Sequence, residues 1–221
     1  MDEADEVRYG VFLVPDARTS AAVTDVTRYV KAQFGLVSAH RFPPHLTLVG
    51  SLPLAVDEAD LVATVGVVAA DHQPVRLVNR GVRLLAGSAL VYEVHHGRDG
   101  KPNRPLVDLA ADVDAAVRPL LRPTVLLPAD VHDRLDWRGH LSLASHELFE
   151  RADLRDEVAE FIEQLAVPYP EISVATRVAV YRQHHPDWSD GWWTGFRWEH
   201  VRSFGLGEGV SARPGRGRPR R

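Results

Sequence analysis

The chain has 221 residues, of which 45% are hydrophobic and none is cysteine, and its net charge is −4 at pH 7. The lack of cysteine excludes disulfides, thiolate zinc sites and a cysteine nucleophile. No apolar run approaches the length that spans a bilayer. Residues 1–6 are acidic and lack the apolar stretch of a secretory signal. We therefore expect a cytoplasmic protein that does not bind membranes.

Hydrophobic spacing predicts strands and helices that alternate along the chain. The predicted elements, in order, are a strand at 9–15, a helix at 17–34, a strand at 44–50, a helix after Asp57, two or three strands within 75–94, a helix at 106–120, a strand at 140–143, a helix after Asp153, and strands at 172–181 and 196–204. Each half therefore contains a helix, a short strand, a second helix and further strands. This repetition predicts an internal pseudo-duplication.

The predicted fold is α+β, with outer helices packed on two antiparallel-rich sheets. No flexible linker separates the two halves, so we expect residues 1–207 to form one bilobal domain. Residues 208–221 contain five arginines and almost nothing apolar, which predicts a disordered basic tail. The tail carries about +4, so the rest of the chain carries about −8. Such an acidic body matches a small nucleotide better than a long polynucleotide.

Two tetrapeptides repeat the same pattern, His45-Leu46-Thr47-Leu48 and His140-Leu141-Ser142-Leu143. The composition predicts only about 0.2 such segments by chance. Successive side chains of a strand point to opposite faces, so each histidine shares a face with the hydroxyl two residues later. The leucines between them face the core. We expect the two motif strands to line a central groove with both imidazoles and both hydroxyls.

This set of side chains suits acid–base chemistry on a phosphodiester. Opening a 2′,3′-cyclic phosphate requires a base that deprotonates water and an acid that protonates the leaving oxygen. Histidine titrates near neutral pH and can do either, so His45 and His140 are the predicted catalytic residues. Thr47 and Ser142 are the predicted phosphate-binding residues, because their hydroxyls can donate hydrogen bonds to the non-bridging oxygens. The mechanism uses no metal and no cofactor.

The paired motifs resemble those of the two-histidine (2H) phosphoesterase superfamily, which includes LigT-like 2′,5′ RNA ligase-like proteins and cyclic nucleotide phosphodiesterases. The resemblance covers about residues 9–206 and is weaker over 180–206 than at the motifs. It implies a bilobal LigT-like sandwich and a phosphoric diester hydrolase of the cyclic phosphodiesterase type. Its substrate would be a 2′,3′-cyclic or 2′,5′-linked phosphodiester of a small nucleotide or RNA 3′-end. We expect a monomer.

Two other functions remain open. One is 2′,5′ RNA ligase-like activity in RNA processing. RNA ligase-like members often have arginine directly after the second motif, but here Ala144-Ser145 follows it. The other is a non-catalytic nucleotide-binding module that uses the same groove, which would not require two matched proton carriers.

Several further residues are weaker candidates. Those expected to contact the substrate are Tyr181, Arg182, Trp193 and Arg41. Tyr181 and Arg182 end a predicted strand, where they would supply a ring and a phosphate contact. Trp193 would lie at the mouth of the groove, and Arg41 would supply local positive charge. Trp198 falls among apolar strand positions, so we expect it in the core. The nine other histidines are expected to be structural.

Overall fold

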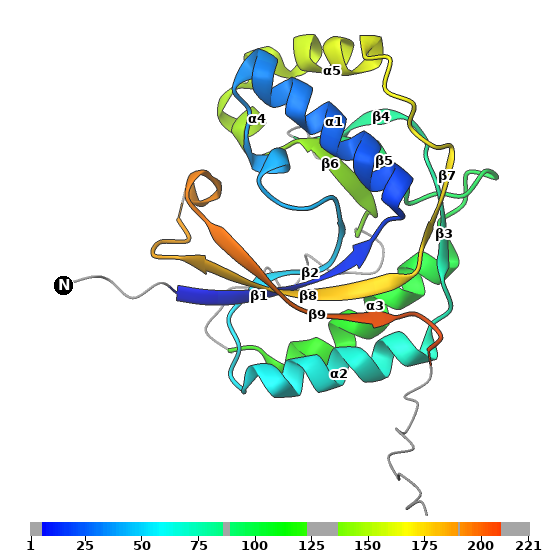
Figure 1. Ribbon diagram of the computed structural model, residues 1–221, viewed down its shortest axis with the longest axis vertical. Coiled ribbons are helices and arrows are strands. Elements are labelled where there is room, and N and C mark those ends of the chain that lie inside the picture. The colour runs from blue at the N-terminus through cyan, green and yellow to red at the C-terminus, as the bar shows by residue number, and fades with distance from the viewer. Residues whose placement is uncertain (1–5, 86–88, 123–136, 190, 209–221) are drawn as a thin grey trace, which may run out of the picture.

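The computed structural model describes residues 6–85, 89–122, 137–189 and 191–208, and in it two antiparallel sheets face each other (Figure 1). The larger sheet has the order β2-β1-β8-β9 and the smaller has the order β4-β5-β6. Strands β3 and β7 form a separate pair. The strands are β1 (Glu6–Val14), β2 (Leu46–Leu52), β3 (Val75–Val78), β4 (Val82–Leu85), β5 (Ala89–Glu93), β6 (His140–Ala144), β7 (Ile172–Ala175), β8 (Arg177–His185) and β9 (Arg197–Gly205).

Helices cover the outer faces of both sheets (Figure 1). The α-helices are α1 (Ala17–Phe34), α2 (Glu58–Asp71), α3 (Arg104–Val117), α4 (Glu147–Glu150) and α5 (Arg155–Gln164). Four 3₁₀ turns are η1 (Ser38–His40), η2 (Arg118–Leu120), η3 (Ala152–Leu154) and η4 (Trp192–Thr194). Helices α2 and α3 pack together beneath the larger sheet, whereas α1 and α5 lie above the smaller one. The inner faces of the sheets are left to line the space between them.

The helix that precedes each motif strand packs on the other motif strand. Helix α1 leads into β2 but packs against β6, and α3 precedes β6 but packs against β2. The two halves of the pseudo-duplication are therefore interlocked. Leu46, Leu48, Leu141 and Leu143 of the two motifs are fully buried in one continuous core. The alternation of each motif thus fixes which face its histidine and hydroxyl occupy.

Local signals in the sequence set the limits of α1. The Asp16 side chain caps its start by accepting a hydrogen bond from the Thr19 amide at 2.8 Å, and it also accepts from the Val174 amide at 3.1 Å. Gly35 ends the helix with φ of 73°, a left-handed conformation that glycine adopts at little cost. Because Asp16 also binds β7, the same residue that starts the helix ties it to a distant part of the chain.

The predicted α+β architecture with two antiparallel sheets and outer helices is confirmed. The single strand predicted at 172–181 is wrong, because the chain leaves the β3–β7 pair at Thr176 and enters the larger sheet as β8. Among the described helices, none is long and apolar enough to cross a membrane. The basic tail beyond Glu208 and most of the irregular segment at 122–138 lie outside the described residues.

Candidate active site

The two motif strands meet at the edges of their sheets. Strand β2 is an edge of the larger sheet, β6 is an edge of the smaller sheet, and the two are in contact. A cavity of about 340 Å³ lies there, within the range of about 300–1,000 Å³ typical of small-molecule sites. His45, Thr47, His140 and Ser142 all line it. Two segments ninety-five residues apart in the sequence therefore bring the four predicted residues into one pocket.

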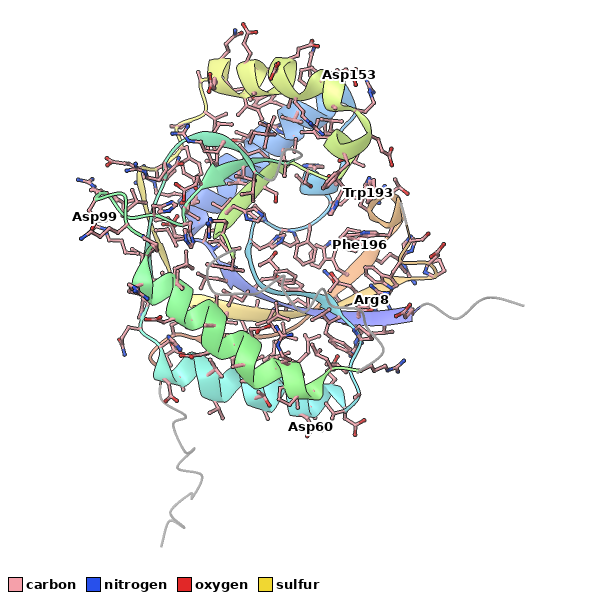
Figure 2. The ribbon with its side chains drawn as sticks, turned by 180° about the vertical axis from the view of Figure 1, so that it is seen from behind. Arg8, Asp60, Asp99, Asp153, Trp193 and Phe196 are labelled. Carbon is pink, nitrogen blue, oxygen red and sulfur yellow. The ribbon has the colours of Figure 1, made fainter. Side chains whose placement is uncertain are left out.

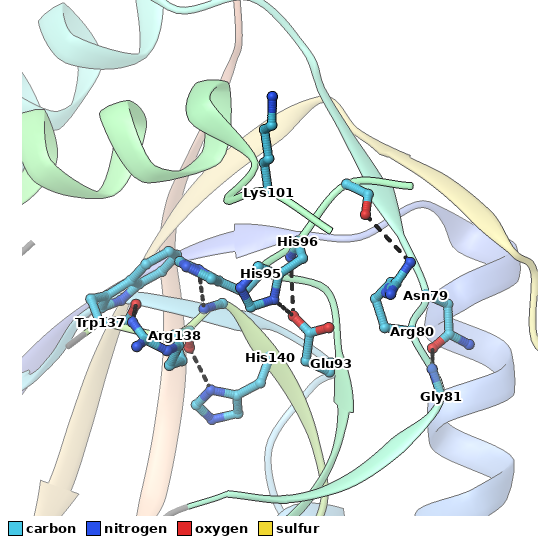
Figure 3. Close-up of polar contacts among 12 residues, drawn as sticks. Asn79, Arg80, Gly81, Glu93, His95, His96, Lys101, Trp137, Arg138 and His140 are labelled. Carbon is cyan, nitrogen blue, oxygen red and sulfur yellow. Dashed lines mark hydrogen bonds and ion pairs between the residues drawn. The ribbon is translucent and has the colours of Figure 1, made fainter. Parts of the chain in front are cut away.

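The two imidazoles are anchored in the same way. His45 Nδ1 lies 2.7 Å from the carbonyl oxygen of Pro43. His140 Nδ1 lies 2.8 Å from the carbonyl oxygen of Arg138, as Figure 3 shows. A carbonyl oxygen only accepts, so Nδ1 carries the hydrogen in each ring. Nε2 is then the nitrogen left to take a proton from a substrate or return one to it. In both motifs the anchor is the carbonyl two residues earlier, so the local backbone sets the tautomer.

The surroundings of both rings favour the neutral imidazole. The pKa of His45 is lowered to about 4, mainly by burial and to a smaller extent by the nearby His140, whereas the hydrogen bond to the Pro43 carbonyl opposes this shift. Burial also lowers the pKa of His140. Both rings are therefore neutral at pH 7. A bound phosphate would raise the pKa of the imidazole beside it and so favour proton uptake there.

Aromatic rings enclose the first motif histidine. The ring centroids of Phe12 and Phe42 lie 4.6 Å and 4.7 Å from that of His45, both in edge-on contact. A Cβ atom on Gly10 would overlap the Phe12 ring, so a residue larger than glycine would displace that ring. Phe12, Phe42 and Phe196 form a small buried cluster separate from the main core, with Tyr181 and Trp192 packed against it. We call these five residues the aromatic wall.

Polar contacts hold the chain just before the second motif histidine. The buried His95 accepts a hydrogen bond at Nδ1 from the Gly139 amide at 3.3 Å (Figure 3). Burial lowers the pKa of His95, which keeps this nitrogen able to accept. A Cβ on Gly139 would lie 2.7 Å from the Leu106 side chain, so a larger residue would force this buried leucine to shift. The Trp137 indole N–H donates to the Thr47 carbonyl at 3.2 Å, which joins the chain before motif two to the free edge of β2.

A carboxylate joins the same two regions at the rim of the pocket. Glu147 accepts hydrogen bonds from the Val37 amide at 2.6 Å and the Ser38 amide at 2.7 Å, and also from the Ser38 hydroxyl. The Ser38 and Ser145 hydroxyls lie 2.9 Å apart. Both serines line the pocket. Glu147 therefore holds the turn before β2 against the segment after β6.

The hairpin that joins β8 to β9 closes one side of the pocket. Trp193 lines the pocket, is 9% exposed, and stacks on His146 with ring centroids 4.9 Å apart. Figure 2 shows Trp193 and Phe196 between the two sheets at this hairpin. Trp192 contacts both His146 and Phe196. Trp193 thus lies in the pocket lining, and its contact with a substrate stays a prediction.

The other predicted contact residues are placed differently. Tyr181 touches Phe42 with ring centroids 5.0 Å apart and belongs to the aromatic wall rather than to the lining. Arg182 lies on the opposite face of the sheet, where its guanidinium bonds Glu58 at 2.7 Å and Glu199 at 3.0 Å. It lines a different cavity, so the structure does not bring it to the histidines.

Arg41 contributes its backbone rather than its charge. Its carbonyl oxygen accepts a hydrogen bond from the Trp198 indole at 2.9 Å, and its side chain is not part of the pocket lining. Trp198 is 37% exposed, so the expectation that it lies in the core is wrong. It packs at the outer side of the aromatic wall against Phe42 and Tyr181.

Sequence reasoning missed several polar residues of the lining, namely Ser38, Ser51, Ser145, His146 and Gln183. Gln183 is 3% exposed, lines the pocket, and has an amide oxygen with no hydrogen-bond partner among the described residues. The available signal was the strand period, since Gln183 shares a face with Tyr181. His146 is a third imidazole in the lining, and burial lowers its pKa. The described lining contains no arginine or lysine.

In the part of the chain that the structure describes, no group of three or more His, Cys, Asp or Glu side chains is arranged to hold a metal ion.

Comparison with known proteins identifies the family. The sequence profile of the 2′-5′ RNA ligase superfamily matches residues 15–187. The match spans most of the chain, so the chain belongs to this superfamily, and the resemblance to two-histidine phosphoesterases is confirmed. A search of the curated proteins finds no match.

Solved structures show the same fold. TT0787 of Thermus thermophilus is similar with a TM-score of 0.55 and 17% identity, over 92% of this chain and 99% of that one. LigT of E. coli in complex with NADP⁺ has a TM-score of 0.51 and 14% identity, again over 92% and 99%. LigT in complex with ATP has a TM-score of 0.50 and 14% identity, over 92% and 98%. The LigT-like sandwich expected from the motifs is therefore the fold of this chain.

Proposed function

We propose that this protein is a metal-independent phosphoesterase that opens the 2′,3′-cyclic phosphodiester of a small nucleotide or RNA 3′-end. The observation that carries the proposal is the matched pair of imidazoles in one pocket, each with Nδ1 fixed on a backbone carbonyl and Nε2 left to exchange protons. A site that only binds nucleotides would not require two matched proton carriers. This pairing therefore supports hydrolysis over a binding module.

The proposed reaction needs one proton transfer on each side of the phosphorus atom. One imidazole takes a proton from water at Nε2 while the water oxygen attacks phosphorus. The bond from phosphorus to one ribose oxygen breaks, and the other imidazole, protonated beside the bound phosphate, gives its proton to that oxygen. The product is a phosphate monoester. The Thr47 and Ser142 hydroxyls donate hydrogen bonds to the non-bridging oxygens, where negative charge increases in the transition state.

The fold neighbours support a nucleotide as substrate. LigT of E. coli, a protein of this fold, has been crystallised with ATP and with NADP⁺. In this chain the pocket combines aromatic rings with hydroxyls and imidazoles, which suits a base and a phosphate together. The volume of about 340 Å³ suits a small ligand, whether free or at the end of an RNA.

Incubation with defined phosphodiesters tests the proposal. The purified protein is assayed with the four 2′,3′-cyclic nucleotides, with 2′,5′-linked dinucleotides and with RNA ending in a 2′,3′-cyclic phosphate, each with and without excess EDTA. We expect hydrolysis that survives the chelator. Loss of activity in EDTA that a divalent ion restores would reject the metal-independent mechanism. Joining of a cyclic phosphate end to a 5′-hydroxyl RNA, without hydrolysis, would favour the ligase alternative.

A further inference from the structure

Gln183 is the one polar side chain of the described lining that is deeply buried and unpaired. It is 3% exposed, and its amide oxygen has no hydrogen-bond partner among the described residues. Most buried side-chain polar atoms in proteins have a partner, because an unpaired one costs free energy. An amide kept in such a place despite this cost indicates a partner that arrives with the ligand.

The surroundings of Gln183 define what that ligand must be. Every second residue of β8 points to the same face of the sheet, so the Gln183 amide is on the same face as Tyr181 and the aromatic wall. Phe12, Trp192 and Phe196 line the same cavity as Gln183. Aromatic faces stack on nucleobases whatever the base, whereas an amide reads a polar edge. A flat heteroaromatic group with donors and acceptors on its rim satisfies both.

We propose that Gln183 recognises the adenine base of the nucleotide, an assignment that rests on the proposed function. The amide oxygen accepts a hydrogen bond from the exocyclic N6 amino group, and the amide nitrogen donates to the adjacent ring nitrogen. Glutamine pairs with adenine in this two-bond manner at other protein sites. The Gln183 oxygen is itself buried, so the amide must turn about its last side-chain bond for both its oxygen and its nitrogen to meet the base. The base then lies against the aromatic wall, and the phosphate lies between His45 and His140.

A pair of substrates that differ by one amino group tests this assignment. Adenosine 2′,3′-cyclic phosphate and purine riboside 2′,3′-cyclic phosphate have the same ring and phosphate, but the second lacks N6. We expect wild-type kcat/KM to favour the adenosine compound by about tenfold or more, because the purine compound leaves the Gln183 oxygen unpaired. In Gln183→Leu the ratio should fall to within about twofold. An unchanged ratio in the variant, or a wild-type ratio near one, would overturn the proposal.

Stability separates a recognition role from a structural one. Leucine has a similar size and removes the unpaired acceptor, so the Gln183→Leu melting temperature should equal or exceed that of the wild type. A clear fall would show that the amide supports the fold. The control is Gln164→Leu, the same change at an exposed position on α5, which should keep the wild-type ratio. If Gln183→Leu does not fold, Gln183→Asn retains the amide one methylene further away and should give an intermediate ratio.

Binding distinguishes failure of this inference from failure of the proposed function. If neither cyclic compound is hydrolysed, the phosphoesterase proposal fails, and calorimetry with adenosine 3′-monophosphate and purine riboside 3′-monophosphate still tests base recognition. Tighter binding of the adenosine compound, abolished in Gln183→Leu, would support the role of Gln183. Equal affinities would overturn it even in an active enzyme.

Discussion

The two motif segments share the anchored imidazole, the hydroxyl two residues later and the buried leucines, but the surroundings of their imidazoles differ. On both sides Nδ1 is fixed on a carbonyl two residues earlier. His45 is then enclosed by the aromatic rings of Phe12 and Phe42, whereas His140 follows a chain held by polar contacts to His95. The two halves therefore share the anchored imidazole, which depends only on the local backbone. The surfaces that distinguish one end of a substrate from the other are not repeated.

Removing either imidazole tests the part that the two segments share. His45→Ala and His140→Ala should each lower kcat by about 10²–10⁴-fold, the usual contribution of a general acid or base. Because the two groups act in one step, the double variant should be little slower than the slower single variant. Steady-state hydrolysis of a 2′,3′-cyclic nucleotide measures this. Full turnover by either single variant would reject the paired mechanism.

The hydroxyls of Thr47 and Ser142 should contribute less to kcat than the histidines do, and the two hydroxyls should contribute equally. Thr47→Val and Ser142→Ala each remove one donor to the phosphate, and we expect kcat to fall by about 10²-fold with a smaller change in KM. Both substitutions leave the leucines of the motif in place, so circular dichroism should be unchanged. A change in KM alone would indicate that these hydroxyls bind the substrate and its transition state equally.

The aromatic enclosure of His45 should make folding stability depend on pH. In the unfolded chain histidine titrates near pH 6.5, but burial lowers the pKa of His45 to about 4. Between these values the unfolded state binds a proton that the folded state does not, so the free energy of unfolding falls as the pH drops from 6.5 to 4. The contribution of His45 is fully present above pH 6.5 and amounts to at most about 3 kcal/mol.

Urea unfolding at pH 7.5 and pH 4.5 measures this effect. His45→Gln should reduce the difference in the free energy of unfolding between the two pH values. The exposed His200 provides the control, and His200→Gln should leave the difference as in the wild type. Equal pH dependence in His45→Gln and the wild type would show that His45 is protonated as readily in the folded chain as in the unfolded one.

The smallest expected effect concerns the bond between the two segments. Trp137→Phe removes the indole donor to the Thr47 carbonyl and should cost about 1 kcal/mol of stability, together with about tenfold in kcat. The control is Trp188→Phe, which removes an indole bond of 3.0 Å to the Glu6 carbonyl outside the pocket lining. It should cost similar stability without the loss in kcat. Equal kinetic effects would show that Trp137 does not position the motifs.

The sequence predicts helices and strands well where apolar residues recur at a regular spacing or where a residue typical of an element's end is present. The helix predicted at 17–34 from apolar spacing and Gly35 matches α1, and the structure adds Asp16 as its N-terminal cap. The separation of β7 from β8 at Thr176 was not predictable in this way. The apolar pattern continues through that residue, and only the pairing of each strand with a different partner divides them. The passage of the chain from one sheet to another at this point depends on tertiary pairing and has no signal in the local sequence.

The residues of the site likewise divide into those that local patterns predict and those that only the tertiary structure brings together. The four motif residues share a pocket because strand alternation and burial of the leucines dictate their face. The same alternation should have excluded placing Tyr181 and Arg182 at one site, since neighbours in a strand point to opposite faces. The aromatic wall was beyond reach because Phe12, Phe42 and Phe196 meet only in three dimensions. Gln183 was within reach, because strand alternation places it on the same face as Tyr181.

The exchange of helices between the halves affects how the chain folds. Helix α1 covers β6 and α3 covers β2, so neither half encloses its own motif strand. A half folded alone would expose the leucines behind its histidine, an apolar face prone to aggregation. Contacts between residues far apart in sequence must form before either strand is covered, which slows folding but makes it cooperative between the halves. The two imidazoles therefore meet only when both halves have folded together.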